Sequence, residues 1–219
     1  MTEVGQVPRL RYDEGCLAAH ALNVIGDRWA LLVVRELMLK PKRFQAIRAG
    51  LPGITAGVLT QRLTQLAAAG VLWHDPDLGA YALTDSGRAL LPVLMALCHW
   101  GARHPGHDPA RFISPTALML SMTANIDRAA AAGWPLVAGM AAGRESFTLR
   151  PDDRGALDVV PGLHDGRAFT LTGTGNTLAR AVYGRRPLAA LAAEGLVAVD
   201  GDPAAAQAFA DLFTLRQAA

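Results

Sequence analysis

The chain has 219 residues, 51% of them hydrophobic and only 18% charged, which excludes a disordered tail and predicts two modest domains, each able to bury a core. The formal net charge of +2 by itself indicates no polyanionic partner. Residues 1–11 lack the apolar run of a signal peptide, and no stretch reaches the ~18 uncharged apolar residues of a membrane span. We therefore expect a cytoplasmic protein with no membrane contact.

Three helices are predicted before residue 50. Apolar residues recur at helical spacing over residues 14–26. A second helix, largely apolar, covers residues 27–40, where Asp27 is a suitable cap and a proline follows the last residue. A short third helix covers residues 43–49, and the Pro-Gly pair in residues 51–54 predicts a turn after it.

A further helix, a hairpin and a longer helix follow. Thr55 is a suitable cap for a helix over residues 55–69, which a glycine ends. Short strands at residues 71–74 and 80–83 flank a turn-forming segment, so together they predict a hairpin of the size of a wing. The fifth helix begins directly after the hairpin and is expected to kink at Pro92.

A linker rich in Gly, Pro, His and charged residues, at positions 101–113, predicts a domain boundary near residue 110. The predicted fold class is α+β, with residues 1–110 as a winged helix-turn-helix domain that ends in the linker and residues 111–219 as an α/β domain. The second domain is expected to contain helices at 115–132, 176–183, 187–194 and 203–213 and strands at 135–140, 146–150, 156–160, 168–172 and 196–200.

The helix over residues 55–69 has two unlike faces. One is apolar and is expected to pack on the preceding helices; it carries Leu59, Leu63 and Leu66. The opposite face is polar but uncharged, and its side chains can hydrogen-bond to base edges in a major groove. It carries Gly57, Thr60, Gln61, Thr64 and Gln65.

Basic residues without acidic neighbours surround this helix. Between Leu37 and His74 there is no Asp or Glu, whereas an ordinary solvated helix, the alternative interpretation, usually mixes both signs of charge. Arginine and lysine in this stretch are suited to phosphate contacts. The candidate DNA contacts are Lys42, Arg43, Arg48, Thr55, Thr60, Gln61, Arg62 and Thr64.

Residues 14–101 resemble the HxlR-type transcription regulators. The motifs that carry the resemblance are Cys16, residues 20–29 (HALNVIGDRW), 42–44 (KRF), 51–54 (LPGI), 58–63 (VLTQRL), 81–84 (YALT), Gly87 and residues 100–101 (WG). The resemblance implies a homodimer, paired through the first and fifth helices, that places two recognition helices in successive major grooves of double-stranded DNA. Asp75 and Asp77 in the wing turn depart from the pattern, since phosphate contact there would prefer arginine.

Residues 114–219 resemble the sterol carrier protein type 2 fold, through residues 173–176 (GTGN) and 195–202 (GLVAVDGD). That resemblance implies a mixed sheet with a hydrophobic cavity for a small apolar effector. The candidate lining residues are Met119, Met122, Met140, Phe147 and Phe169, which ordinary core packing explains equally well.

The sequence therefore predicts a DNA-binding transcription regulator rather than an enzyme, without a metal or cofactor, because no catalytic or metal-ligating spacing is present. Two alternatives stay open. In one, the second domain is a lipid carrier or enzyme and the winged helix serves only for dimerisation. In the other, Cys16 acts as a redox switch, as the cysteine at this position can do in the resembling family, although a free cysteine is often only a small buried hydrophobe.

Overall fold

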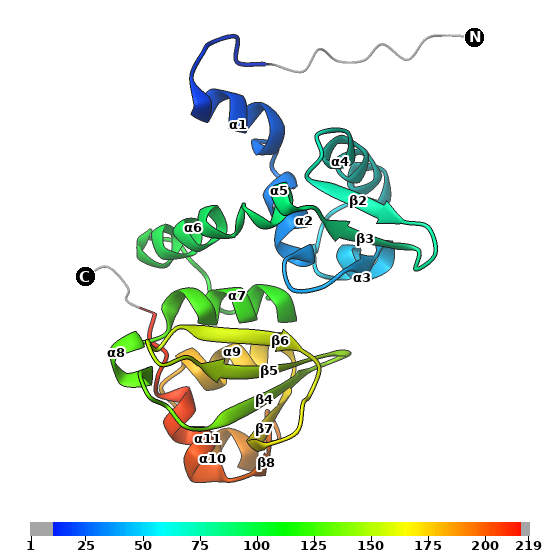
Figure 1. Ribbon diagram of the computed structural model, residues 1–219. Helices are drawn as coiled ribbons and strands as arrows, with labels where there is room; N and C mark the ends of the chain where they lie inside the picture. Colours follow the sequence, from blue (N-terminus) through cyan, green and yellow to red (C-terminus); the bar gives the residue numbers. More distant parts are fainter. Residues whose placement is uncertain (1–10, 216–219) are drawn as a thin grey trace.

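The computed structural model describes residues 11–215. Figure 1 shows the helices and the small hairpin of the first half above, the larger sheet of the second half below, and one helix lying between them. Among the described residues no single helix is long and apolar enough to cross a membrane; the first two helices reach that length only as a pair bent by 76°.

The first half contains the predicted helices and hairpin. Its elements are α1 (Leu17–Ile25), α2 (Ala30–Leu37), β1 (Lys42–Arg43), α3 (Phe44–Ala49), α4 (Ala56–Ala68), β2 (Leu72–Asp75), β3 (Ala80–Leu83), α5 (Asp85–Arg88) and α6 (Leu91–Arg103). β2 and β3 form the expected antiparallel hairpin, and β1 pairs with the free edge of β3, which gives the strand order β1-β3-β2. β1 was not predicted, because two residues carry no alternating pattern.

The predicted fifth helix is interrupted rather than kinked. Thr84 caps α5 by accepting a hydrogen bond from the Gly87 backbone, and α5 ends at Arg88. α6 then starts at Leu91, with Pro92 in its first turn. A proline has no N–H to donate, so it is tolerated at a helix start and disfavoured in a helix interior.

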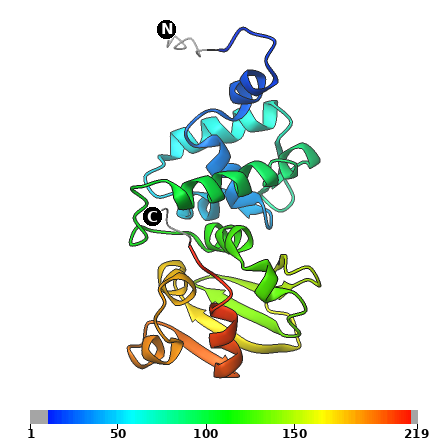
Figure 2. The ribbon, with the colours of Figure 1, turned by 90° about the vertical axis from the view of Figure 1, so that its left-hand side faces the viewer.

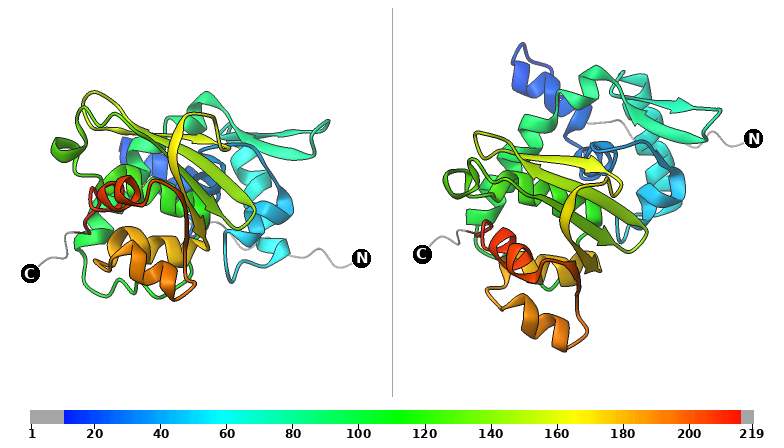
Figure 3. Two further views of the ribbon diagram at one scale, coloured as in Figure 1. Left: turned by 90° about the horizontal axis from the view of Figure 1, so that it is seen from below. Right: turned by 60° about the horizontal axis from the view of Figure 1, so that its bottom comes forward.

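The second half is a sheet with helices. Its elements are α7 (Pro115–Asn125), α8 (Arg128–Ala131), β4 (Val137–Ala142), β5 (Glu145–Pro151), β6 (Leu157–Pro161), β7 (Arg167–Gly173), α9 (Gly175–Tyr183), α10 (Leu188–Ala193), β8 (Ala198–Gly201) and α11 (Pro203–Ala210). The strand order is β6-β5-β4-β7-β8, and only the β4–β7 pair is parallel, which makes the sheet mixed, as predicted. α9, α10 and α11 lie on the same side of the sheet (Figure 3).

The helix predicted over residues 115–132 is divided in two. Ile126 leaves the helical conformation and bridges to Phe213, and Asp127 then caps α8 through the backbone N–H groups of Ala129 and Ala130. An aspartate that caps a new helix is a local signal for such a break.

Two hydrophobic cores lie on either side of α7. The first joins α2, α3 and α4 with the hairpin, and the second lies between the larger sheet and its helices. α7 contributes Leu120 to the first core and Leu118 and Met119 to the second. Figure 2 shows α7 between the two halves, which are therefore in direct contact.

Candidate nucleic-acid interface and the buried charges behind it

α4 has the two faces that the sequence predicts. The Thr55 hydroxyl accepts a hydrogen bond from the Val58 backbone N–H at 3.3 Å, which fixes the start of the helix. Leu59, Leu63 and Leu66 are at most 2% exposed and belong to the first core. The apolar face of α4 is thus fixed in the protein, while Thr60, Gln61 and Thr64 on the opposite face are exposed.

The outer face of α4 is small, polar and uncharged. Thr60, Gln61 and Thr64 are all exposed. The two threonine hydroxyls donate to the carbonyls four residues before them, both at 3.0 Å, so they offer an acceptor oxygen and a methyl group outward. At Gly57 an added Cβ would meet nothing within 4 Å, so a partner can approach the backbone closely there.

Two of the predicted phosphate contacts are exposed. Arg43 precedes α3, and its Nε donates to the Leu78 carbonyl of the wing turn at 3.2 Å. Arg48 lies in the last turn of α3. In the turn itself, Asp75 accepts backbone hydrogen bonds from Asp77 and Leu78 at 3.0 and 3.1 Å, so this carboxylate shapes the wing.

Arg62, predicted as a phosphate contact, is buried instead. Only 8% of the residue is exposed, and its Nη2 lies 2.9 Å from Asp27 Oδ2. The guanidinium also bonds to Gln65. Because Asp27 lies between α1 and α2, this arginine joins α4 to that junction and is removed from the DNA contacts.

Lys42, also predicted as a phosphate contact, is buried between the two cores. Only 4% of the residue is exposed. Its ammonium donates to Glu36 Oε2 at 3.1 Å, to Glu145 Oε1 at 2.9 Å and to Thr116 Oγ1 at 2.9 Å. All three donor hydrogens are used inside the protein, so Lys42 too is removed from the DNA contacts.

Glu36, in α2, is fully buried and fully hydrogen-bonded. Besides Lys42, its carboxylate accepts from Arg35 Nη2 at 2.8 Å and from Ser114 Oγ at 2.6 Å. Gly50 leaves the space for it, because a Cβ there would lie 2.3 Å from Glu36 Oε2. The cost of burying this charge is therefore offset by donors from both halves of the chain.

Glu145, the first residue of β5, contacts both lysines of the chain. Lys42 Nζ and Lys40 Nζ lie 2.9 and 3.1 Å from its two oxygens. Burial is the largest influence and raises the pKa of Glu145, but the two ammonium groups together outweigh it and hold the pKa below the ordinary value of 4.5. This stabilisation is present above the ordinary pKa and is lost as the pH falls through the lowered one. We call Glu36, Lys40, Lys42, Thr116 and Glu145 the charge cluster.

Sequence reasoning missed the charge cluster. The available signals were the charged pair Arg35–Glu36 at the end of an otherwise apolar stretch and the presence of only two lysines in the chain. Neither signal identifies Glu145, which is 103 positions from Lys42.

The five candidate ligand-lining residues all lie in the second core. Each is at most 2% exposed and packs with other core residues. They are Met119, Met122, Met140, Phe147 and Phe169. Two hollows on the surface are lined by other side chains, one at the end of α6 and one beside Tyr183. The five residues therefore fill the core of the second half.

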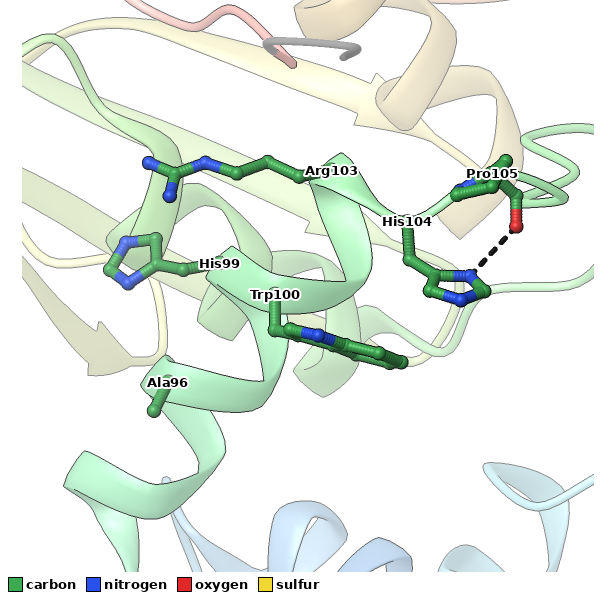
Figure 4. A pocket seen from close by; sticks show the side chains of 6 residues that line it. All are labelled: Ala96, His99, Trp100, Arg103, His104 and Pro105. Carbon is green, nitrogen blue, oxygen red and sulfur yellow. Dashed lines mark hydrogen bonds between the residues drawn. The ribbon is translucent and has the colours of Figure 1, made fainter.

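Apolar side chains on α1 and α6 face solvent. They are Leu17 and Leu22 on α1 and Val93, Leu97 and Trp100 on α6. Trp100 is 64% exposed, and its ring lies beside that of His104 with the centroids 4.6 Å apart (Figure 4). Ala96, His99, Arg103 and Pro105 complete the hollow around them. Exposed apolar side chains that gather on a helix are typical of an interaction surface.

The two cysteines differ in environment. Cys16 is exposed at the cap position of α1, and Cys98 is half-buried in α6. Burial raises the pKa of the Cys98 thiol, an effect that the charge of Arg35 only partly offsets. Because the thiolate is the reactive form, iodoacetamide at about pH 8 should alkylate Cys16 at least about tenfold faster than Cys98.

Timed quenching of the native chain, followed by peptide mass spectrometry, measures both alkylation rates. The same reaction in denaturant is the control and should make the rates similar. Similar rates in the native chain would contradict the difference in environment. Redox control through Cys16 requires an exposed thiol, which the structure has, and it stays a prediction.

The fold of the first half and the exposed polar face of α4 define a helix-turn-helix protein. A family model described as HxlR-like helix-turn-helix matches residues 24–108. An uncharacterized HTH-type transcriptional regulator of Methanothermobacter thermautotrophicus is 34% identical over 98 residues, which are 42% of this chain and 75% of the relative. The uncharacterized HTH-type transcriptional regulator YvaP of Bacillus subtilis is 36% identical over 85 residues, which are 36% of this chain and 79% of the relative.

The chain belongs to the HxlR family of helix-turn-helix transcription regulators. A solved structure of quinone-bound YodB from B. subtilis is 31% identical and covers 38% of this chain and 93% of that one, with a TM-score of 0.36. The family model ends at residue 108, so the family covers the first half of the chain.

Proposed function

We propose that this chain is a homodimeric regulator that recognises specific DNA sequences by placing α4 in the major groove. The supporting observation is the outer face of α4, whose exposed side chains are polar and uncharged and can hydrogen-bond to base edges. Thr60, Gln61 and Thr64 are the proposed base contacts, and Thr55 lies at the helix start. Arg43 and Arg48 are the proposed phosphate contacts.

Removing an arginine that neutralises a phosphate should reduce the salt dependence of DNA binding. The change Arg48→Ala is expected to lower the slope of log affinity against log salt by about 1 for each phosphate that is no longer neutralised. Fluorescence anisotropy with any labelled duplex, titrated at several salt concentrations, measures the slope. Arg150→Ala is the matched control, since Arg150 is an exposed arginine of the second half and should leave the slope unchanged. Equal slopes for wild type and Arg48→Ala would contradict the proposed role of Arg48.

The proposed dimer pairs the exposed apolar surfaces of α1 and α6. Burying these side chains against a second copy would remove apolar area from water, the usual driving force of association. In a two-fold dimer the same surface serves both partners, and each copy contributes one α4. The dimer then has two recognition helices, one for each half-site of the DNA.

A charge in the middle of this surface should break the dimer. Leu97 is 46% exposed, so Leu97→Glu is expected to leave the fold intact while weakening association at least about tenfold, because a buried, unpaired carboxylate is costly. Sedimentation equilibrium measures the dissociation constant. Val160→Glu changes an apolar residue of similar exposure on β6 and is the control. An unchanged dissociation constant for Leu97→Glu would place the interface elsewhere.

The second half is the proposed effector-binding domain, resembling a sterol carrier. Its core is separate from that of the DNA-binding half, and it carries ten basic and ten acidic residues over 111–219, a balance that gives no attraction for a polyanion. A small apolar effector would enter by displacing core side chains. Methionines at 119, 122 and 140 suit such rearrangement, because their side chains are flexible and unbranched.

A further inference from the structure

The charge cluster is a polar connection between the two cores. Glu36 and Lys42 come from the DNA-binding half, Thr116 from α7, and Glu145 from the larger sheet. Lys42 and Glu36 are almost completely buried, so these contacts are little weakened by solvent. A movement at one member must therefore be accommodated by the others or leave a buried charge without a partner.

Lys42 lies where it can transmit such a movement to the DNA-binding surface. It forms β1 with Arg43, and β1 pairs with β3 of the wing through Lys42–Tyr81 and Arg43–Ala80. The next residues form α3, whose end leads through a short turn to Thr55, the cap of α4. The position of Lys42 thus fixes the wing and the start of the segment that carries the proposed DNA contacts.

Glu145 lies where it can receive a signal from the second core. Phe147 follows two residues later on the same face of β5 and is fully buried in that core, opposite Met140 on β4. The Lys40 ammonium lies 5.9 Å from the centre of the Phe147 ring and also pairs with Glu145. A rearrangement of Phe147 can therefore reach the Glu145 carboxylate in two ways, through Lys40 and along β5.

We propose that Glu145 is a positioning residue for DNA recognition, through which the second domain sets the orientation of the wing and of α4. The inference rests on the proposed function, because it concerns the regulation of the same interface. An apolar effector that displaces Phe147 would shift Glu145, take away one of the three hydrogen-bond partners of the Lys42 ammonium and thereby loosen β1. DNA bound to α4 would, in the reverse direction, hold β1 and thereby steady the β4–β5 hairpin, since coupling between two sites is reciprocal.

Hydrogen exchange of the full-length chain, with and without a DNA duplex of its own upstream region, tests this coupling. In the wild type, DNA should slow exchange in α4 and also, about fivefold or more, in residues 142–151. In Glu145→Gln, which keeps the shape and removes the charge, DNA should slow exchange in α4 but no longer in residues 142–151. Glu194→Gln is the matched control, because it removes an exposed glutamate that pairs with Arg186 in the same domain, and it should behave as the wild type.

The outcomes separate this inference from the proposed function. DNA could slow exchange in α4 and change the exchange rate of residues 142–151 equally in the wild type and in Glu145→Gln. In that case Glu145 has no positioning role, while the proposed DNA binding is supported. If DNA slows exchange nowhere in α4 of the wild type, the proposed function fails, and this inference with it. If Glu145→Gln does not fold, Glu145→Asp replaces it, because this change keeps the charge and removes one methylene. DNA should then protect residues 142–151 from exchange less than in the wild type. Undiminished protection would overturn the proposal.

Discussion

Replacing Lys42 by methionine should lower the free energy of unfolding by about 3–5 kcal/mol, the usual cost of removing one partner from a buried ion pair. The methionine stem fills the same space, but Glu36 and Glu145 each lose a charged donor and Thr116 loses a hydrogen bond. Urea unfolding at neutral pH, followed by circular dichroism, measures the change.

Lys40→Met is the matched control for that experiment. It removes the other lysine from the same carboxylate, but the Lys40 side chain is 32% exposed, so the expected cost is only about 0–1 kcal/mol. A cost below about 1 kcal/mol for Lys42→Met, or equal costs for the two variants, would contradict the role of the charge cluster.

Gly57→Glu should weaken DNA binding at least about tenfold per half-site while raising the stability of the chain. An added Cβ at Gly57 meets nothing within 4 Å, and α4 has no acidic residue in its first turn. Replacing glycine in a helix gains about 0.5–1 kcal/mol, and a carboxylate near a helix N-terminus adds a few tenths. The same side chain would stand between α4 and the groove and repel the phosphates.

Thermal unfolding and a DNA titration of the same preparation measure both effects of Gly57→Glu. Ala189→Glu is the control for net charge, since Ala189 is exposed at the start of α10, far along the chain from α4. Weaker DNA binding together with a lower unfolding temperature would indicate damage to the fold. Unchanged DNA binding by a stable Gly57→Glu protein would exclude the outer face of α4 from the interface.

Most elements of both halves could be predicted because their signals are local. Thr55 caps α4 through its own next turn, and Asp75 closes the wing turn through residues two and three positions later. Caps, turns and apolar periodicity act within a few residues, so they are visible in the sequence. The strands of the mixed sheet were also found, although their order depends on pairing between distant segments.

The sequence does not show which basic residues are buried in ion pairs and which are exposed, because their partners are distant along the chain. The stretch from Leu37 to His74 has no acidic residue, yet Arg62 pairs with Asp27 before it, and Lys42 pairs with Glu36 before it and Glu145 far after it. A count of charges along the sequence does not show which are paired in space. Arg43 and Arg48 are the predicted phosphate contacts that the fold leaves exposed.

Selection of bound duplexes from a random-sequence DNA pool by the full-length chain shows whether α4 of a dimer recognises a DNA sequence. Successive rounds should enrich a symmetric sequence with two half-sites about 10 base pairs apart, one for each copy of α4. Gly57→Glu, carried through the same rounds, should not enrich it. A wild-type selection that ends with no sequence enriched over the starting pool would contradict sequence-specific recognition by α4.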